Sequence, residues 1–85
     1  MKLLVEISLY PLAEEYVVPI QDFIDRLNSY GELEVKTSTT NTLVKGNYEF
    51  VMDILGREIK RTHEEVGQAI FVCKFLNGTH LDVPA

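Results

Sequence analysis

Six consecutive small polar residues, Thr37 to Thr42, are the part of this chain best suited to bind a ligand. They read Thr-Ser-Thr-Thr-Asn-Thr and lie between two runs that are typical of strands. Buried hydroxyl and amide groups each need a hydrogen-bond partner, so such a run is poor material for a hydrophobic core. Two interpretations follow. The segment is either a hydrated hairpin turn or a set of donors and acceptors that binds a small polar molecule.

Groups suited to catalysis are sparse. The two histidines are His63, in a charged run, and His80, near the C-terminus. No serine has an evident histidine partner, no glycine-rich phosphate loop is present, and Glu64 and Glu65 are expected to face solvent. The single Cys73 excludes an internal disulfide and a cysteine-rich metal site, and its apolar surroundings favour a small buried hydrophobe. We therefore expect no enzyme and no cofactor.

Length and charge limit the class of protein. Eighty-five residues make one domain, expected to span residues 1–85 with a short C-terminal tail at 77–85. Eight basic and thirteen acidic residues give a net charge of −5, which argues against nucleic acid because phosphate binding requires a basic face. No apolar run approaches the roughly 20 residues that span a bilayer, and Glu6 interrupts the short N-terminal one. We expect no membrane insertion and a cytoplasmic location.

Hydrophobic periodicity predicts six elements in the order strand, helix, strand, strand, helix, strand. Pro11 is expected to end the first strand, Gly31 to follow the first helix, and Gly46-Asn47 to end the third strand. Asn47 and Gly67 are expected to cap the second helix. The expected strands are 2–10, 33–38, 42–45 and 69–76, and the expected helices are 17–30 and 48–65.

This order, in one small domain, predicts a ferredoxin-like α+β sandwich of βαββαβ topology, with two helices on one face of a four-stranded antiparallel sheet. The face expected to point at the helices carries Leu3, Val5, Ile7, Leu9, Phe71, Cys73 and Phe75. The other face is expected to carry Glu6, Ser8, Tyr10, Lys36, Ile70, Val72 and Lys74. A mixed exposed face of this kind is a candidate surface for another subunit or a ligand.

The sequence lacks the residues required for two other functions that this fold hosts. An acylphosphatase-like site requires an arginine in the loop after the first strand. The only charged residues at 11–15 are the acids Glu14 and Glu15. An RNA-recognition sheet would present aromatic residues on its third strand, and residues 42–45 contain none.

Parts of the chain resemble a known family. The segment Val-Glu-Ile-Ser-Leu-Tyr-Pro-Leu at 5–12, the short helix after it and the polar hairpin at 37–46 resemble the YkoF-like family. Its members are thiamine- or hydroxymethylpyrimidine-binding domains of ferredoxin-like fold, and the resemblance covers nearly the whole chain. It implies a non-enzymatic protein of thiamine salvage or transport. It also implies self-association through the sheet, which for a single domain means a homodimer or homotetramer.

An aminopyrimidine presents a ring-nitrogen acceptor beside an amino donor. Asn41 supplies both groups from one side chain, and the neighbouring hydroxyls are adaptable. Tyr10, Tyr48 or Phe50 would serve as a wall for the ring, and Glu6 would favour a thiazolium cation. The candidate ligand-binding residues are Glu6, Ser8, Tyr10, Ser38, Thr40, Asn41, Thr42 and Tyr48.

The alternative is a structural or regulatory interaction module without a small-molecule ligand. In that case the exposed sheet face pairs with itself or a partner, and the threonine-rich hairpin only solvates an edge. Glu6 would then pair with Lys36 or Lys74 across subunits. For the ligand-binding interpretation, thiamine, its phosphates and hydroxymethylpyrimidine all stay open.

Overall fold

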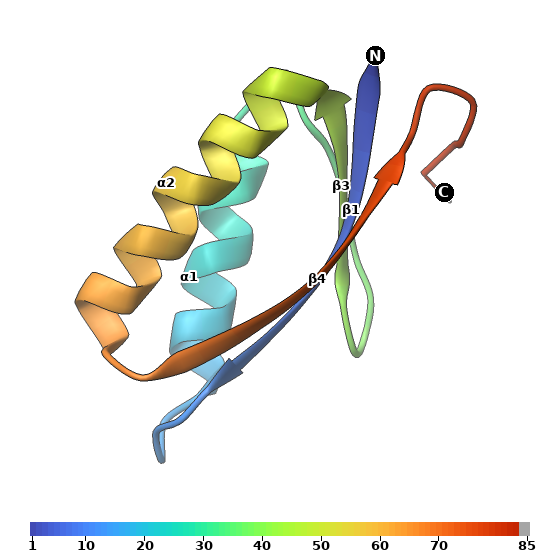
Figure 1. The fold of residues 1–85 in the computed structure, drawn as a ribbon. Coiled ribbons are helices and arrows are strands. Elements are labelled where there is room, and N and C mark those ends of the chain that lie inside the picture. The colour runs from blue at the N-terminus through green and yellow to red at the C-terminus, as the bar shows by residue number, and fades with distance from the viewer. Residues whose placement is uncertain (84–85) are drawn as a thin grey trace.

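Two helices cover one face of a four-stranded antiparallel sheet in the computed structural model, which describes residues 1–83 (Figure 1). The strands are arranged in the order β2-β3-β1-β4. This is the ferredoxin-like α+β fold that the sequence predicts. The elements are β1 (Lys2–Pro11), α1 (Val17–Asn28), β2 (Glu34–Thr37), β3 (Thr42–Asn47), α2 (Tyr48–Val66) and β4 (Ala69–Asn77).

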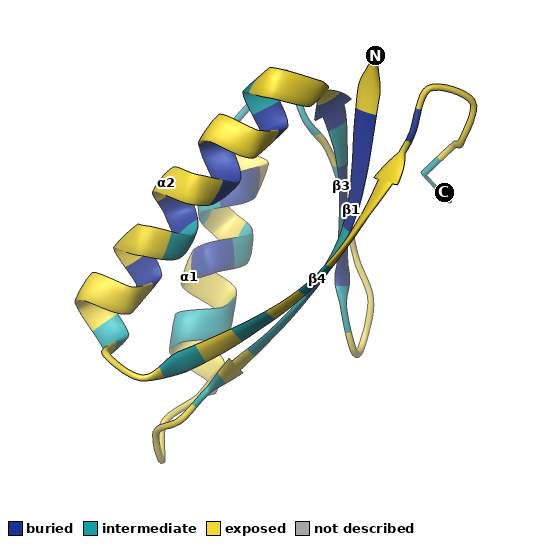
Figure 2. Ribbon diagram, viewed as in Figure 1, coloured by how far each residue is buried: buried dark blue, intermediate teal, exposed yellow. Residues whose placement is uncertain are grey.

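The core lies between the helices and the sheet (Figure 2). Alternation along β1 places Leu3, Val5 and Ile7 on the covered face, as predicted. The helical stripes of α1 and α2 supply the other side of the core. The buried residues of this cluster are Leu3, Val5, Ile7, Phe23, Leu27, Val44, Val51, Ile54 and Leu55. No helix among residues 1–83 is long and apolar enough to cross a membrane.

The two ends of α2 are capped as the sequence predicts. The Phe50 N–H donates to Asn47 Oδ1 at 3.1 Å, which satisfies one of the unpaired donors at the helix start. At the other end Gly67 has φ +86°, a conformation that residues with a Cβ rarely adopt, and its N–H donates to His63 O at 2.9 Å.

Two predicted boundaries are wrong by two residues, and the others agree within one residue. Helix α1 ends at Asn28, where the Ser29 hydroxyl donates to Arg26 O at 2.6 Å, and Gly31 lacks the positive φ of a glycine cap. Strand β3 continues through Gly46 to Asn47. A Cβ at position 46 would lie 3.0 Å from Leu33 Cδ2 and 3.2 Å from a Val51 methyl group. Gly46 is therefore a point of close packing within the strand and does not end it.

The open face, meaning the face of the sheet away from the helices, also differs from expectation at one end. Leu4 lies on this face and is nevertheless buried. The chain after β4 returns over it: the Gly78 N–H donates to Lys2 O at 2.9 Å, and the Lys2 N–H donates to Thr79 Oγ1 at 3.2 Å. The expected tail at 77–85 thus begins one residue later, after Asn77, and residues 84–85 lie outside the described residues.

Phe75 is the one predicted core residue on β4 that does not join the core. It pairs with Val5 and so shares the covered face, yet 52% of its surface is exposed. Strand β4 is at the edge of the sheet, and the packing against the core extends only to Phe71 and Cys73. Burial raises the pKa of the Cys73 thiol, and the residue is partly buried against the core, where the sequence favoured a buried hydrophobe.

A buried ionic cluster that the sequence did not predict joins the two helices. Arg26 Nε of α1 donates to Glu58 Oε1 of α2 at 2.7 Å, and the Tyr30 hydroxyl donates to Glu58 Oε2 at 2.5 Å. Arg26 Nη2 also donates to Thr62 Oγ1 at 2.6 Å. Both carboxylate oxygens of Glu58 are therefore satisfied, as a buried charge requires.

The cluster controls the ionisation of Glu58. Burial alone would raise the pKa of this carboxyl, but the hydrogen bonds from Tyr30 and Arg26 and the charge of Arg26 outweigh burial and lower it. The unfolded chain titrates near the usual value of 4.5. Ionised Glu58 therefore stabilises the fold above that pH, and the contribution is lost as pH falls through the lower folded pKa.

We expect Glu58→Gln to lower the free energy of unfolding at pH 7 by about 3 kcal/mol, because Arg26 keeps its charge and loses the buried carboxylate beside it, which leaves only the more exposed Glu65 Oε2 at 3.9 Å. The variant should also lose less stability than the parent chain on acidification below pH 4.5. Urea denaturation at a series of pH values measures both effects. Glu64→Gln, on an exposed position of α2, is the matched control. Equal stability of the two variants would contradict the role assigned to the cluster.

Candidate functional site

A cavity of about 560 Å³ lies at the end of the sheet where β1 runs past β3. One wall is formed by β1 and the loop after it, a second by α1 between Ile20 and Ile24, and a third by residues 37–42, here named the polar hairpin segment. In Figure 1 the loop between β2 and β3 diverges from the end of β1 at this point. The lining residues are Ile7, Ser8, Leu9, Tyr10, Pro11, Leu12, Tyr16, Ile20, Phe23, Ile24 and all six residues of the polar hairpin segment.

Unequal strand lengths create the cavity. Strand β3 begins at Thr42, opposite Ile7, so residues 8–11 of β1 pair with β4 alone. The side of β1 that β3 leaves uncovered at residues 8–11 is here named the free edge. Six consecutive residues, Ile7 to Leu12, line the cavity although alternate side chains of a strand point to opposite faces. The cavity therefore lies along the free edge of the strand and not above one face.

The polar hairpin segment is held by its own hydrogen bonds. The Ser38 N–H donates to Asn41 O at 2.9 Å and closes the turn, and Ser38 Oγ donates to Asn41 Oδ1 at 2.7 Å. Ser8 Oγ on β1 donates to Thr40 O at 3.2 Å, which fixes the segment relative to the strand. The hydroxyls of Thr37 and Thr42 are 3.3 Å apart and can hydrogen-bond to each other. Much of the polarity of the segment is thus structural, as the plain hairpin interpretation requires.

Other polar groups of the wall remain available. Within residues 1–83 no hydrogen bond engages Asn41 Nδ2 or the hydroxyls of Thr39 and Thr40. The same holds there for the phenol groups of Tyr10 and Tyr16, which are 54% and 56% exposed. Small-molecule sites typically combine a few amide and hydroxyl groups with aromatic and aliphatic walls.

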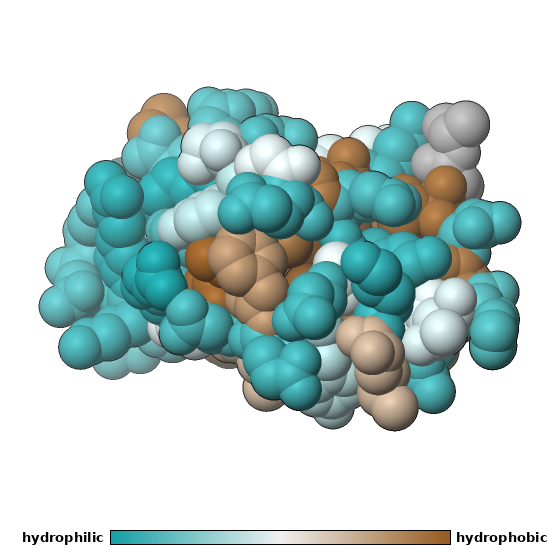
Figure 3. Space-filling view, turned by 90° about the horizontal axis from the view of Figure 1, so that it is seen from above, coloured by the Kyte–Doolittle hydropathy of each residue, from teal (hydrophilic) through white to brown (hydrophobic). Residues whose placement is uncertain are grey.

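Six of the eight candidate residues line the cavity, namely Ser8, Tyr10, Ser38, Thr40, Asn41 and Thr42. Glu6 does not: its Oε1 lies 3.8 Å from Lys74 Nζ on the open face. Tyr48 lies at the opposite end of β1, where its N–H donates to Met1 O at 3.1 Å. Viewed from above, that end is mostly hydrophilic, with small separate groups of hydrophobic side chains (Figure 3).

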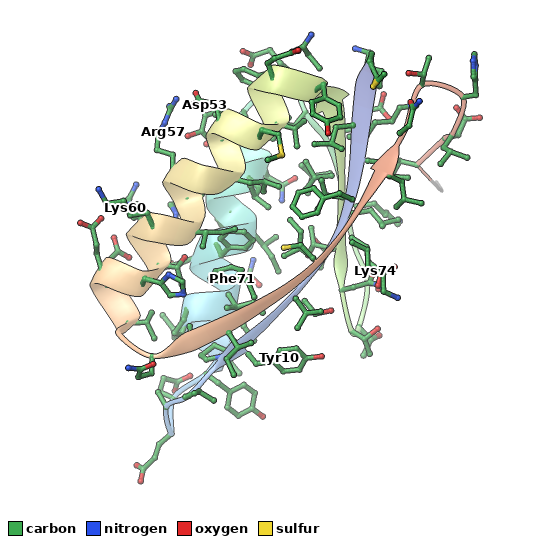
Figure 4. All side chains as sticks on the ribbon, in the orientation of Figure 1. Tyr10, Asp53, Arg57, Lys60, Phe71 and Lys74 are labelled. Atoms are coloured by element: carbon green, nitrogen blue, oxygen red, sulfur yellow. The ribbon has the colours of Figure 1, made fainter. Side chains whose placement is uncertain are left out.

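Of the three aromatic residues expected as a wall for the ring, Tyr10 lines the cavity and Tyr48 and Phe50 do not. Phe50 packs edge-on against Tyr30, with ring centroids 6.3 Å apart, and does not line the cavity. Tyr48 is excluded by its position, so Tyr10 is the one of the three at the cavity. Figure 4 shows the Tyr10 side chain extending from the end of β1 on the side away from the helices.

Sequence reasoning missed the apolar part of the site. Leu12 and Tyr16 lie in the loop after β1 and were not considered as wall residues. Ile20, Phe23 and Ile24 on α1 were not considered either; Phe23 is buried in the core and also reaches the cavity. The available signal was the presence of Leu12 and Tyr16 close to Glu14 and Glu15, because a solvated loop does not require large apolar side chains.

The electrostatics of the cavity are simple. None of its sixteen lining residues has a charged side chain. Glu15 precedes the lining residue Tyr16, and its Oε1 accepts hydrogen bonds from Val17 N–H at 3.0 Å and Val18 N–H at 3.4 Å at the start of α1. Such a cavity suits a ligand with an apolar or aromatic body and an uncharged polar edge.

His63 does not line the cavity. His63 Nε2 lies 3.0 Å from Ala69 O, and its ring packs edge-on against Phe71, labelled in Figure 4, at a centroid distance of 5.4 Å. Within residues 1–83 no group of three or more His, Cys, Asp or Glu side chains is placed to hold a metal ion.

Comparison with known proteins extends the description of the fold. No protein-family model matches the chain, and no curated protein does. Among solved structures, a candidate thiamine biosynthesis/salvage protein of Thermotoga maritima is 21% identical, with a TM-score of 0.80 over 88% of this chain and 82% of that one. A Streptococcus pneumoniae protein is 20% identical, with a TM-score of 0.85 over 98% and 93%. A Bacillus cereus domain of unknown function, DUF77, is 14% identical, with a TM-score of 0.71 over 99% and 83%.

At these identities, the likeness shows the fold. All three neighbours are matched over more than four fifths of their own length, so the architecture is shared as a whole.

We expect Ser8→Ala to loosen the polar hairpin segment, because it removes the hydrogen bond to Thr40 O. The free energy of unfolding should fall by about 1 kcal/mol, and amide hydrogen exchange at residues 39–41 should accelerate. Ser29→Ala, which removes an equally exposed hydroxyl–carbonyl bond at the end of α1, is the control. If exchange at 39–41 is the same in both variants, Ser8 does not position the hairpin.

Proposed function

We propose that this protein binds thiamine or its hydroxymethylpyrimidine moiety, as a non-enzymatic binding protein of thiamine salvage or transport. One observation carries the proposal: an uncharged cavity with aromatic walls brings together six of the eight residues selected for such a ligand. The resemblance to the YkoF-like family led to that selection. Support also comes from the Thermotoga maritima neighbour, described as a candidate thiamine biosynthesis/salvage protein.

The cavity fits a substituted pyrimidine in size and chemistry. Its volume of about 560 Å³ is within the range of small-molecule sites, about 300–1,000 Å³. The rings of Tyr10 and Tyr16 and the side chain of Ile24 offer flat and apolar contacts. Because Asn41 Oδ1 already accepts from Ser38, the side chain of Asn41 serves the ligand chiefly as a donor through Nδ2.

A role in binding alone is supported by what lines the cavity. Its sixteen residues include no histidine, cysteine, carboxylate, lysine or arginine, so no hydroxyl in the lining has a strong base beside it. We therefore propose that the ligand is held unchanged and that no further cofactor takes part.

Calorimetric titration with hydroxymethylpyrimidine should show saturable binding in the micromolar range, about −8 kcal/mol. Asn41→Ala should weaken binding by about 1–3 kcal/mol, because a buried acceptor of the ligand loses its donor. Asn77→Ala, which removes an amide at the end of β4 outside the cavity lining, should leave affinity unchanged. Equal affinity in the two folded variants would remove Asn41 from the site.

Asn41→Asp separates the two functions of the side chain. Aspartate keeps an oxygen that accepts from Ser38 Oγ, so the turn stays closed, but it loses the Nδ2 donor. We expect this variant to keep the stability of the parent chain and to bind the uncharged pyrimidine as weakly as Asn41→Ala. Circular dichroism melting and the same titration measure the two properties. Retained affinity would contradict the donor role.

Self-association through the open face is the second proposal, either accompanying ligand binding or, without a ligand, as the function of a structural or regulatory module. Tyr10, Ile70 and Val72 on this face are about half exposed. Tyr10 pairs with Ile70, and the adjacent Ser8 pairs with Val72, so the three side chains form one apolar patch. A second copy covering it, in a homodimer or homotetramer, would remove this patch from water.

Val72→Lys should shift the protein toward monomer in sedimentation velocity, because it places a charge in the proposed interface. Met52→Lys, at a similarly exposed apolar position on α2, should leave the distribution unchanged. The opposite pattern would place the contact on the helical side of the molecule. Association without any thiamine or pyrimidine binding would favour the interaction module over the binding protein.

A further inference from the structure

The backbone of β1 is itself a part of the cavity wall. Along an extended strand the N–H and C=O groups of alternate residues point to opposite edges. The Leu12 N–H donates to Gln68 O at 3.0 Å and Lys2 O accepts from Gly78 N–H at 2.9 Å, so even-numbered residues of β1 point toward β4 and the chain beside it. Met1 O accepts from Tyr48 N–H at 3.1 Å on the other side. Odd-numbered residues therefore point toward β3 and, beyond its start, toward the cavity.

Among residues 1–83, this alternation leaves Leu9 without a strand partner on that side. Ile7 is opposite Thr42, the first residue of β3. Two residues further along β1, Leu9 presents an N–H and a C=O at the free edge, and Pro11 presents a C=O without an N–H. The proline is tolerated there because its missing N–H would face the cavity and not the β4 ladder.

The hairpin keeps this edge open. The Ser38–Asn41 turn closes the β2–β3 hairpin directly before Thr42, whereas β3 would have to begin two residues earlier, at Thr40, to cover Leu9. The bond from Ser8 Oγ to Thr40 O then holds the hairpin wall in place across the cavity. The unpaired donor and acceptor of Leu9 thus face a wall that carries the available Asn41 Nδ2.

We propose that Leu9 binds the acceptor–donor edge of an uncharged aminopyrimidine, so that the ring occupies the place of the missing β3 residue. The proposal rests on the proposed function and names the form of the ligand. A strand residue offers an N–H beside a C=O, and an aminopyrimidine offers a ring nitrogen beside an amino group, which is the complementary pair. The second ring nitrogen is left for Asn41 Nδ2. Both edges of a flat ring are then used between the two walls.

The charge of the wall decides between forms of the ligand. A phosphate ester would place at least one negative charge beside sixteen residues that include no cation. We therefore infer selection for the free hydroxymethylpyrimidine over its phosphate, by at least about tenfold in affinity.

The backbone contact is tested by nuclear magnetic resonance on the labelled protein during titration with hydroxymethylpyrimidine. We expect the Leu9 amide to shift downfield and become protected from hydrogen exchange as the ligand saturates. The Ile7 amide, already paired with β3, and the Tyr10 amide, which points toward β4, are internal controls and should keep their protection. Saturable binding with no change at Leu9 would overturn this inference and leave the proposed function intact.

Ligand analogues and a pair of variants complete the test. The dimethylamino and des-amino pyrimidines lack the donor and should bind at least about tenfold more weakly. Leu9→Pro removes the N–H and should weaken binding about tenfold relative to Leu9→Ala, which loses the same packing but keeps the N–H. If Leu9→Pro does not fold, the analogue series alone decides. Equal affinity of the analogues would contradict the inference, and absence of binding by any of the pyrimidines would contradict the proposed function as well.

Discussion

The mismatch in length between β1 and β3 is the constraint on which the site depends. Strand β1 runs to Pro11 and is paired with β4 from Leu3 to Pro11, while β3 begins opposite Ile7. Backbone groups that face another strand elsewhere in the sheet therefore face a cavity here. Because an unpaired backbone donor or acceptor is costly to bury without a partner, this part of the chain must remain hydrated or receive a ligand that completes its hydrogen bonds.

The rest of the fold maintains that mismatch. Phe23 and Leu27 of α1 pack in the core with residues of β1, and Arg26 and Glu58 join α1 to α2. The helix that forms one wall of the cavity is therefore fixed by contacts outside the cavity. The hydrogen bond from Ser8 to Thr40 fixes the hairpin wall relative to β1. A cavity supported on rigid elements in this way needs little rearrangement to bind a small planar ligand.

The sequence predicted the element order, the fold and both caps of α2, because each depends on local periodicity or a single special residue. It did not predict the use of Gly46, which depends on how closely Leu33 and Val51 approach, or the Glu58 cluster, in which Tyr30 and Arg26 lie 28 and 32 residues from Glu58. For the site, the polar residues could be selected from composition and family resemblance. Tyr16 and the backbone of Leu9 could not, because their positions at the cavity depend on where β3 begins relative to β1.

A crystal structure of the protein grown with hydroxymethylpyrimidine tests the central claim most directly. The account predicts one planar molecule in the cavity between the free edge of β1 and the polar hairpin segment, with its amino group and adjacent ring nitrogen on the backbone of Leu9. A molecule bound elsewhere, or a cavity that holds only water at saturating ligand, would contradict it.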